Sequence, residues 1–394
     1  MPVARDFLFG AWRAVPVLGL TQIIAWGTIY YTPVLMVPLI TAERGFSFTL
    51  GMGGFSAGLL TASLLAPTVG GLIDRHGGHR VMPFGSLAGA VGLFALTHAS
   101  HVVAYYATWM LLGAAMAASL YDPAFATLGR IFGGQARSPI TALTLIGGFA
   151  STVSWPLTYL LLQHLGWKGT YLAYAALLAL VAAPLHAFAL PRTRAETGGG
   201  AGAAASTAGS TRPARGAVFL LVIAAFAAYA FVPSGLSAHL LAILRRAGID
   251  PATVVFIGAL FGPAQVGARL CELVFARNVH PLVVARFAVA LLLTAFLLLA
   301  LLGFSAPVAI LFAVMFGVAN GLSTIARGAV PLALFGAAGY GRIVGRIAAP
   351  SLIVIAIAPM VVAFMAERVS DAAALGATAG FAALSLACFL LVRR

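Results

Sequence analysis

The sequence contains few charged residues. Only 8% of its 394 residues are Asp, Glu, Lys or Arg, and 62% are hydrophobic, whereas a soluble domain has about 25% charged and about 45–50% apolar residues. A soluble globular protein is therefore excluded. Because a single core cannot bury so much apolar surface, lipid must be the solvent for most of the chain.

Residues that support catalysis are also scarce. The two cysteines, Cys271 and Cys388, lie in apolar stretches, where they indicate neither a disulfide framework nor a metal site. The chain lacks HExxH and paired acids. A formal nucleophile-elbow pattern, Gly54–Gly58, lies in an apolar helix instead of a strand-to-helix turn. We therefore predict that the protein is not an enzyme and has no metal or cofactor. The lack of a soluble output domain also disfavours a receptor.

Long apolar runs make up most of the sequence. The net charge of +14 does not indicate nucleic-acid binding, because the basic residues flank apolar runs and form no basic patch. A spanning helix needs about 20 apolar residues. Twelve runs meet this length, over residues 14–40, 48–73, 81–99, 102–129, 139–163, 168–190, 217–242, 252–276, 282–303, 306–327, 347–366 and 372–392.

A segment rich in Gly, Ala, Ser and Thr interrupts the helices at residues 191–216. Such a composition is typical of a flexible linker. Six expected helices lie on each side of it, and a Pro followed by a Gly recurs in the second and the eighth. We therefore expect a first bundle over 1–190 and a second over 217–394, as in transporters built from parallel six-helix repeats.

The distribution of basic residues predicts the orientation. If the N-terminus is cytoplasmic, most Arg residues fall on the cytoplasmic side, since loops there carry an excess of positive charge. The opposite side then receives only Arg44, Lys168, Arg245, Arg246 and Arg368. We expect both termini to be cytoplasmic in a multi-pass protein of a bacterial inner membrane.

The turn between the second and third expected helices carries the sequence GGLIDRHGGHR over residues 70–80. Gly70 and Gly77 allow a helix end to pack closely and turn. Asp74 can accept hydrogen bonds from the N-terminus of a neighbouring helix. Arg75 and Arg80 can pair with acids or phosphates. This pattern favours a conformational latch, and an ordinary basic loop is the alternative.

The motif resembles the cytoplasmic loop motif of the major facilitator superfamily, which reads glycine, any residue, leucine, any residue, Asp-Arg, any residue, glycine and then basic residues. It departs from that pattern at Gly78 and His79, which replace a basic pair. The resemblance implies an all-α membrane protein with twelve transmembrane helices in two six-helix bundles. It also implies transport by rocking of the two halves about a midplane site.

The eighth expected helix contains three polar residues, Gln265, Arg269 and Glu272. A charge inside a membrane helix costs at least about 2.5–3.5 kcal/mol and normally faces a partner or a wet cavity. Gln265 and Arg269 share a helix face, and Glu272 is within reach of Arg269. Arg269 is therefore interpreted as a clamp for a substrate carboxylate, or alternatively as the partner of Glu272.

This helix also resembles that of monocarboxylate transporters and oxalate/formate exchangers, in which a substrate-binding Arg lies one turn after a polar or acidic residue. Arg269 matches that Arg, whereas Gln265 stands where many animal members have Asp. The basic residue that dicarboxylate exchangers use in the eleventh helix has no counterpart in 347–366. The resemblance therefore implies a carrier for a monocarboxylate.

Further candidates for the substrate site lie on other helices. Gln22, Trp26 and Tyr30 share one face of the first helix, with Tyr31 beside them, and these residues either line a wet cavity or form an interfacial belt or helix contact. His239 either contacts substrate or lies at the outer rim near Arg245 and Arg246. Asn320 either binds substrate or belongs to a small-residue packing face.

Three of these membrane residues are candidate proton carriers: His239, Glu272 and Asp122. For Asp122, bonding to backbone freed by Pro123, or to a basic latch residue, is the other interpretation. We predict a monomeric secondary transporter for a small organic anion, moved with protons by alternating access. An exporter of amphipathic drugs or metabolites is the alternative.

Overall fold

The computed structural model describes residues 10–192 and 216–393. These two ranges are helical and contain no strand, as lipid requires of a backbone that must satisfy its own hydrogen bonds. The first range forms η1 (Ala11–Arg13), α2 (Ala14–Ala25), η2 (Trp26–Tyr31), α3 (Pro33–Arg44), α4 (Phe48–His76), α5 (Gly78–His98), α6 (Val102–Ser119), α7 (Tyr121–Phe132), η3 (Gly133–Gln135), α8 (Arg137–Gly147), α9 (Ala150–Leu177), η4 (Leu178–Ala182) and η5 (Leu185–Ala189). The second forms α10 (Ala217–Arg246), α11 (Pro251–Cys271), η6 (Glu272–Ala276), α12 (Pro281–Leu302), α13 (Ala306–Phe335), α14 (Tyr340–Arg368) and α15 (Asp371–Leu391). The predicted linker, apart from its ends, lies outside the described residues.

Within the described residues, eleven helical stretches are long and apolar enough to span a membrane. One of them, Arg137–Ala189, reverses direction at Gly166, whose φ is 63°. The hydroxyls of Thr158 and Tyr174, on either side of this turn, are 2.7 Å apart although 16 residues separate them. A straight helix would place them about 24 Å apart. The stretch is therefore an antiparallel pair, and residues 10–192 and 216–393 together make twelve crossings, as the sequence predicts.

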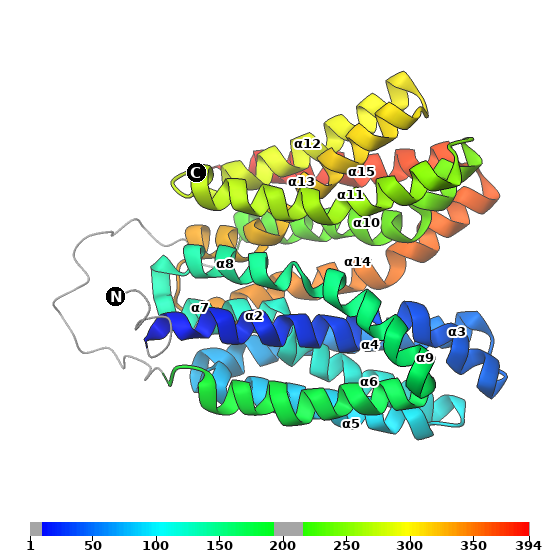
Figure 1. Ribbon diagram of the computed structural model, residues 1–394. Helices are drawn as coiled ribbons and strands as arrows, with labels where there is room; N and C mark the ends of the chain where they lie inside the picture. The colour runs from blue at the N-terminus through cyan, green and yellow to red at the C-terminus, as the bar shows by residue number, and fades with distance from the viewer. Residues whose placement is uncertain (1–9, 193–215, 394) are drawn as a thin grey trace.

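The crossings form two bundles, each with its own large apolar cluster. Helices α2 to α9 form one bundle and α10 to α15 the other (Figure 1). Most buried apolar side chains of the second bundle, from Phe219 to Val392, form one cluster, whereas Trp109, Tyr105 and Tyr171 lie in a cluster of the first. A third cluster contains Phe125 and Tyr340 and joins the two bundles. The two bundles meet chiefly where α14 packs on α4 and α7, and where α8 packs on α11 and α13.

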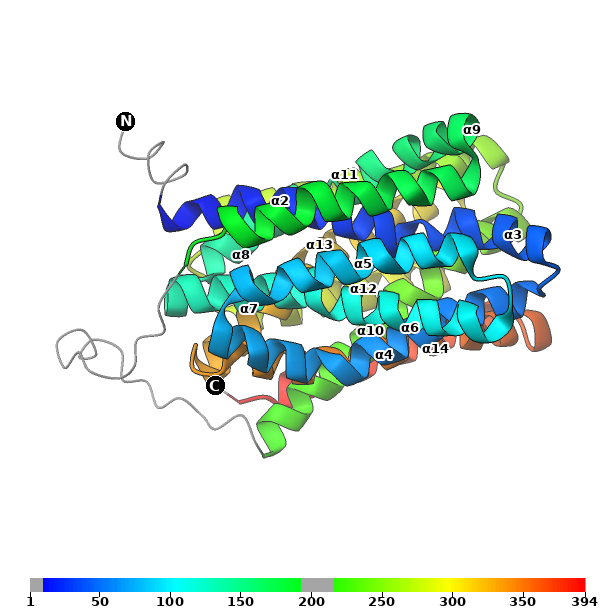
Figure 2. The same ribbon diagram turned by 90° about the horizontal axis from the view of Figure 1, so that it is seen from below.

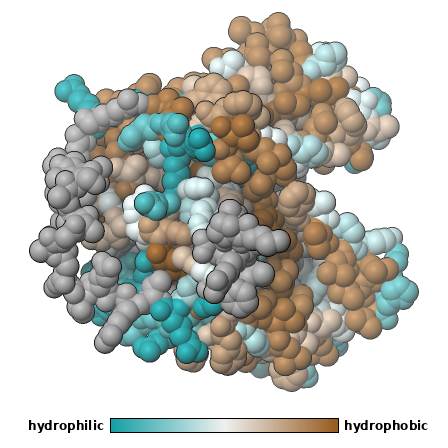
Figure 3. All heavy atoms as spheres, turned by 60° about the vertical axis from the view of Figure 1, so that its left-hand side comes forward, coloured by the Kyte–Doolittle hydropathy of each residue, from teal (hydrophilic) through white to brown (hydrophobic). Residues whose placement is uncertain are grey.

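The two ends of the molecule differ. We call the end where α2 begins and α15 finishes the terminal end (Figure 1). There, α14 of the second bundle lies directly beside α4 of the first (Figure 2). Toward the opposite end, the surface is hollowed between the two lobes (Figure 3). The bundles are therefore closed on each other at the terminal end and separate toward the other.

Two helix boundaries differ from the prediction because charged residues occur inside helices. The tenth crossing, expected to end at residue 327, continues to Phe335, so Arg327 lies within it. The eleventh, expected from residue 347, begins at Tyr340 and includes Arg342 and Arg346. A charge within a helix is tolerated when it has a partner or reaches water, and composition alone shows neither.

Candidate functional site

An aromatic cluster lies on the first helix, where the backbone widens into a π-helical turn over Trp26–Tyr31. The ring centroid of Trp26 lies 4.6 Å from that of Tyr30 and 5.8 Å from that of Tyr31. Single π turns are frequent at functional sites, and here the wider turn brings consecutive tyrosines onto one indole. Tyr121, which the sequence analysis did not single out, completes the cluster 5.2 Å from Trp26.

Arg269 lies at the interface between the bundles and is 4% exposed. Its Nη1 donates to the carbonyl oxygen of Thr144 in the other bundle at 2.9 Å, and its Nη2 lies 3.4 Å from Gln265 Oε1. Its Nε has no hydrogen-bond partner among the described residues, nor does any carboxylate there form an ion pair with it. This buried cation therefore retains donor capacity for an anion.

The guanidinium of Arg269 occupies space that a glycine provides. A methyl group at Gly148 would collide with Arg269 Nη1, and one at Gly147 would come within 2.7 Å of the Tyr121 hydroxyl. Arg269 also interacts electrostatically with the hydroxyls of Tyr31 and Tyr121. The helix break at this glycine pair thus brings Arg269 to the aromatic cluster. The two consecutive glycines are the feature of the sequence from which this close approach could have been predicted.

Two other candidates lie near Arg269. Gln265 contacts Arg269 weakly through its amide oxygen, as described above. Asn320 accepts a hydrogen bond from the Tyr229 hydroxyl at 3.2 Å, and Tyr229 in turn interacts electrostatically with Arg269. The second bundle therefore contributes an amide and a phenol on the Arg269 side of the interface.

Gln22 and His239 are engaged in contacts within their own bundles. Gln22 is fully buried, donates to the Ser119 carbonyl at 2.7 Å and accepts from Trp26 Nε1 at 3.1 Å. It thus satisfies the carbonyl where α6 breaks before α7 and fixes the indole. His239 Nε2 lies 3.1 Å from the Pro359 carbonyl oxygen. No hydrogen bond joins either residue to Arg269 within the described parts of the chain.

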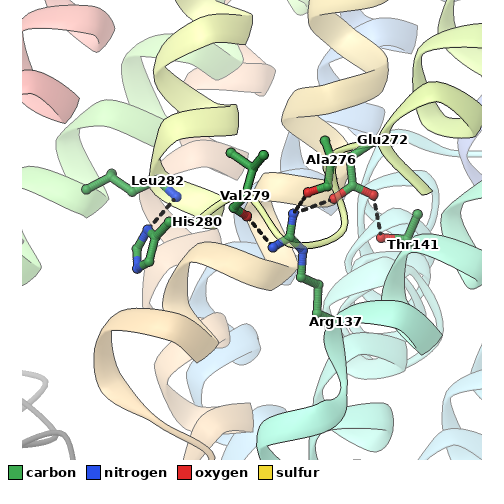
Figure 4. A network of polar contacts seen from close by, with 7 residues as sticks. All are labelled: Arg137, Thr141, Glu272, Ala276, Val279, His280 and Leu282. Carbon is green, nitrogen blue, oxygen red and sulfur yellow. Dashed lines mark hydrogen bonds and ion pairs between the residues drawn. The ribbon is translucent and has the colours of Figure 1, made fainter. Parts of the chain in front are cut away.

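Glu272 pairs across the interface with Arg137, so the alternative interpretation, an Arg269–Glu272 pair, is not found. Arg137 Nη2 lies 2.7 Å from Glu272 Oε1, and Thr141 donates to Oε2 at 3.1 Å. The same guanidinium donates to the carbonyl oxygens of Ala276 and Val279, which close the end of the α11 crossing (Figure 4). An arginine from the start of α8 thus caps the C-terminal end of a helix in the other bundle.

Asp122 also pairs across the interface. Its Oδ2 accepts from Arg327 Nη2 at 2.8 Å, and this ion pair joins α7 to α13. Arg327 also interacts electrostatically with Tyr30 of the aromatic cluster. Arg269 is therefore not the single cation inside the membrane region, because Arg327, paired with Asp122, lies beside the cluster.

The residues of the predicted latch lie at the terminal end. Asp74 accepts hydrogen bonds from the backbone N–H groups of Gly341 and Arg342, both at 2.8 Å, at the start of α14. Gly77 has a φ of 83° and begins the turn into α5. A methyl group at Gly70 would collide with the Gly341 carbonyl oxygen, so this glycine permits the two helices to touch through their backbones.

The two arginines of the motif do not share this contact. Arg75 and Arg80 are exposed, and neither forms an ion pair within residues 10–192 and 216–393. Arg130 instead donates to the Asp74 carbonyl oxygen. The terminal end therefore has two polar contacts between the bundles. In one, the Asp74 carboxylate accepts from N–H groups at the start of α14. In the other, the Arg137 guanidinium donates to carbonyl oxygens at the end of the α11 crossing.

Comparisons with known proteins agree with this architecture. The human organic anion transporter MFSD10 (TETRAN) superposes with a TM-score of 0.70 at 18% identity, over 96% of this chain and 98% of that one. The E. coli fucose:proton symporter FucP gives 0.74 at 11% identity, over 97% and 99%. FucP in an outward conformation gives 0.70 at 13%, over 96% and 99%. No curated protein matches the chain.

These identities support the fold alone. The family itself comes from the sequence model of the Major Facilitator Superfamily, which matches residues 18–326. Members of this family are transporters and not enzymes. The chain is therefore a multi-pass membrane transporter that belongs to the Major Facilitator Superfamily.

Proposed function

We propose that this transporter carries a small organic anion with one carboxylate, coupled to protons, by alternating access. The observation that carries the proposal is Arg269, a buried cation with an unpaired Nε and no acidic partner among the described residues. A guanidinium binds a carboxylate through two parallel hydrogen bonds. The aromatic rings beside it would cover the organic part of the substrate.

The charge around the cluster favours one carboxylate. The Asp122–Arg327 pair is neutral as a unit, and Glu272 is neutralised by Arg137. Arg269 is then left as the uncompensated charge of the site. A monoanion balances it, whereas a dianion brings a second charge into a low-dielectric cavity at a cost of several kcal/mol. Of the matching structures, the organic anion transporter carries a cargo of this class, and the fucose:proton symporter is coupled to protons.

Among the predicted proton carriers, Asp122 is the best placed. It lies between the bundles, and its partner Arg327 interacts with Tyr30 of the aromatic cluster. Protonation would release Arg327 and weaken the contact between α7 and α13, so proton binding would be linked to separation of the bundles. Glu272 lies farther toward the terminal end with Arg137, and His239 bonds within its own bundle.

The same proposal includes topology. We infer a monomer with bundles over residues 1–190 and 217–394 joined by the linker 191–216, in a bacterial inner membrane. The terminal end would then be cytoplasmic, because most arginines lie there. The contacts of Asp74 and Arg137 would close the cytoplasmic side, and their release would open it to the cargo.

The test is uptake of organic acids into proteoliposomes by Arg269→Ala. Loss of a charge-assisted, bidentate contact removes about 3 kcal/mol, so uptake at low substrate should fall about a hundredfold. Arg368→Ala, which removes an exposed arginine near the opposite end, is the matched control and should transport normally.

Gly148→Ala provides a milder second variant, because its methyl group displaces the guanidinium without removing the charge. It should weaken uptake while the protein remains folded. Near wild-type uptake by folded Arg269→Ala would refute the anion site, and efflux of a neutral or cationic amphiphile would then be the better function.

A further inference from the structure

A groove unrelated to the inter-bundle site lies on the outer side of the second bundle. It has a volume of about 550 Å³ and runs between α11, α12 and α13. Its wall is apolar: Cys271 and Phe275 of the α11 crossing face Phe287 of α12 across it, and Glu272 is its one charged lining residue. Glu272 is 2% exposed and neutralised by Arg137, so the groove presents no free charge.

The length and position of the groove match one leaflet of a bilayer. Its lining residues on the α11 crossing run from Ala264 to Ala276, which spans about 18 Å at the rise of a helix. Half of a hydrocarbon core is about 15 Å. Val279 and Val283, on the turn into α12, place its mouth at the terminal end. The groove therefore extends from the membrane surface to near the midplane.

One basic residue lies next to the mouth of the groove in the chain. Arg277 directly follows the lining residue Ala276, is exposed, and has no ion-pair partner in the described ranges. Asn278 beside it is also exposed. A cation at the membrane surface above an apolar groove is complementary to a lipid with an anionic headgroup, since basic pockets between transmembrane helices bind such headgroups.

We propose that this groove is a binding site for an anionic phospholipid of the leaflet at the terminal end. One acyl chain lies between α11 and α12, and the phosphate is bound by Arg277. Gly267, which lines the groove, leaves the middle of the site open, because a methyl group there would meet no atom within 4 Å.

The site also adjoins an inter-bundle contact. Three of its lining residues, Glu272, Ala276 and Val279, are the groups that accept hydrogen bonds from Arg137 (Figure 4). A lipid acyl chain packed against this turn holds the three groups that accept from Arg137 in place. The bound lipid therefore stabilises the state that is closed at the terminal end, and by linkage the closed contact strengthens lipid binding.

The experiment is binding of radiolabelled dioleoylphosphatidylglycerol to the full-length protein in detergent, with dioleoylphosphatidylcholine as the competitor. We expect saturable binding, with phosphatidylcholine weaker by about fivefold, as expected for one basic residue at a membrane surface. Arg277→Gln should abolish this preference. Equal affinity of the two lipids for the wild type would overturn the headgroup assignment.

Two glycine variants test whether the acyl chain of the lipid lies in the groove. Gly267→Leu fills the groove and should weaken binding about tenfold, as overpacking does. Gly380→Leu is the matched control, because this glycine also has open space around it but lies on the exposed face of α15. Equal binding by these two variants would overturn the groove as the site.

Arg137→Ala, made together with Glu272→Gln so that no unpaired carboxylate is left in the groove, tests the coupling to the closed state. The variant should bind phosphatidylglycerol about fivefold less tightly, which is within the range of typical coupling between sites. Unchanged affinity would overturn the link to the inter-bundle contact. This assay measures no transport, so its outcome is independent of the proposed cargo.

Discussion

Replacing Asp74 by Asn should shift the protein away from the state that is closed at the terminal end. The carboxylate accepts two backbone N–H groups at the start of α14, at 2.8 Å each. Asn keeps one acceptor but turns an NH₂ group toward the second N–H. One hydrogen bond to a charged group is worth about 1.5–3 kcal/mol, and the helix dipole adds about 0.3–1 kcal/mol. For this partly exposed carboxylate we take about 2 kcal/mol, or about thirtyfold in population.

Spin labels at Arg75→Cys and Arg342→Cys would report this population, because both side chains are exposed on opposite sides of the contact. With Asp74→Asn, the long-distance component should grow and transport turnover should fall more than substrate affinity. Asp250→Asn is the matched control, since Asp250 caps its own helix, α11, and does not join the bundles. An unchanged distance distribution together with normal turnover would refute the latch.

Three further predictions concern charge and the linker. Monocarboxylates should compete for uptake better than dicarboxylates of similar size, and Arg269→Lys should impair transport because an ammonium cannot reproduce the bidentate geometry; equal competition in an inhibition assay would contradict this. Asp122→Asn should remove the stimulation of uptake by an imposed pH gradient, and an unaltered response of uptake to the gradient would exclude Asp122 as the proton carrier. Because Arg327 then has no counter-ion, dicarboxylates should also compete better for uptake in this variant. Replacing Gly198–Ser210 by a neutral linker of equal length should leave uptake intact, and its loss in correctly inserted protein would show that the segment does more than tether.

The sequence was sufficient to predict the crossings and one inter-bundle contact. Apolar length marks spanning helices because the bilayer sets that length, and the hydrogen bonds of Asp74 to a helix N-terminus were expected from the chemistry of its motif. For Arg269 the sequence predicts a partner or a wet cavity, because a buried cation needs a polar surrounding, and its place at the interface is a finding of the structure. Its role in substrate binding stays a prediction.

Features that depend on contacts between distant segments were not predictable. Glu272 lies three residues from Arg269 but pairs with Arg137, which is 135 residues away in the chain. The sequence places Arg327 at the end of a helix, because composition does not show that it pairs with Asp122 of the other bundle. The π-helical turn at Trp26 is likewise not predictable from the pattern, since a regular period of 3.6 residues assumes uniform helix geometry.

The backbone contact between α4 and α14 has a consequence for the proton gradient across the membrane. Gly70 and Gly341 bring main chain against main chain, and a methyl group at Gly345 would collide with the Ala66 carbonyl oxygen. At these glycines main chain meets main chain, so no side-chain rotation opens this contact, and it separates only when whole helices move apart. A membrane containing the protein in this state should therefore hold a pH gradient without leak, and protons should cross only with a complete transport cycle.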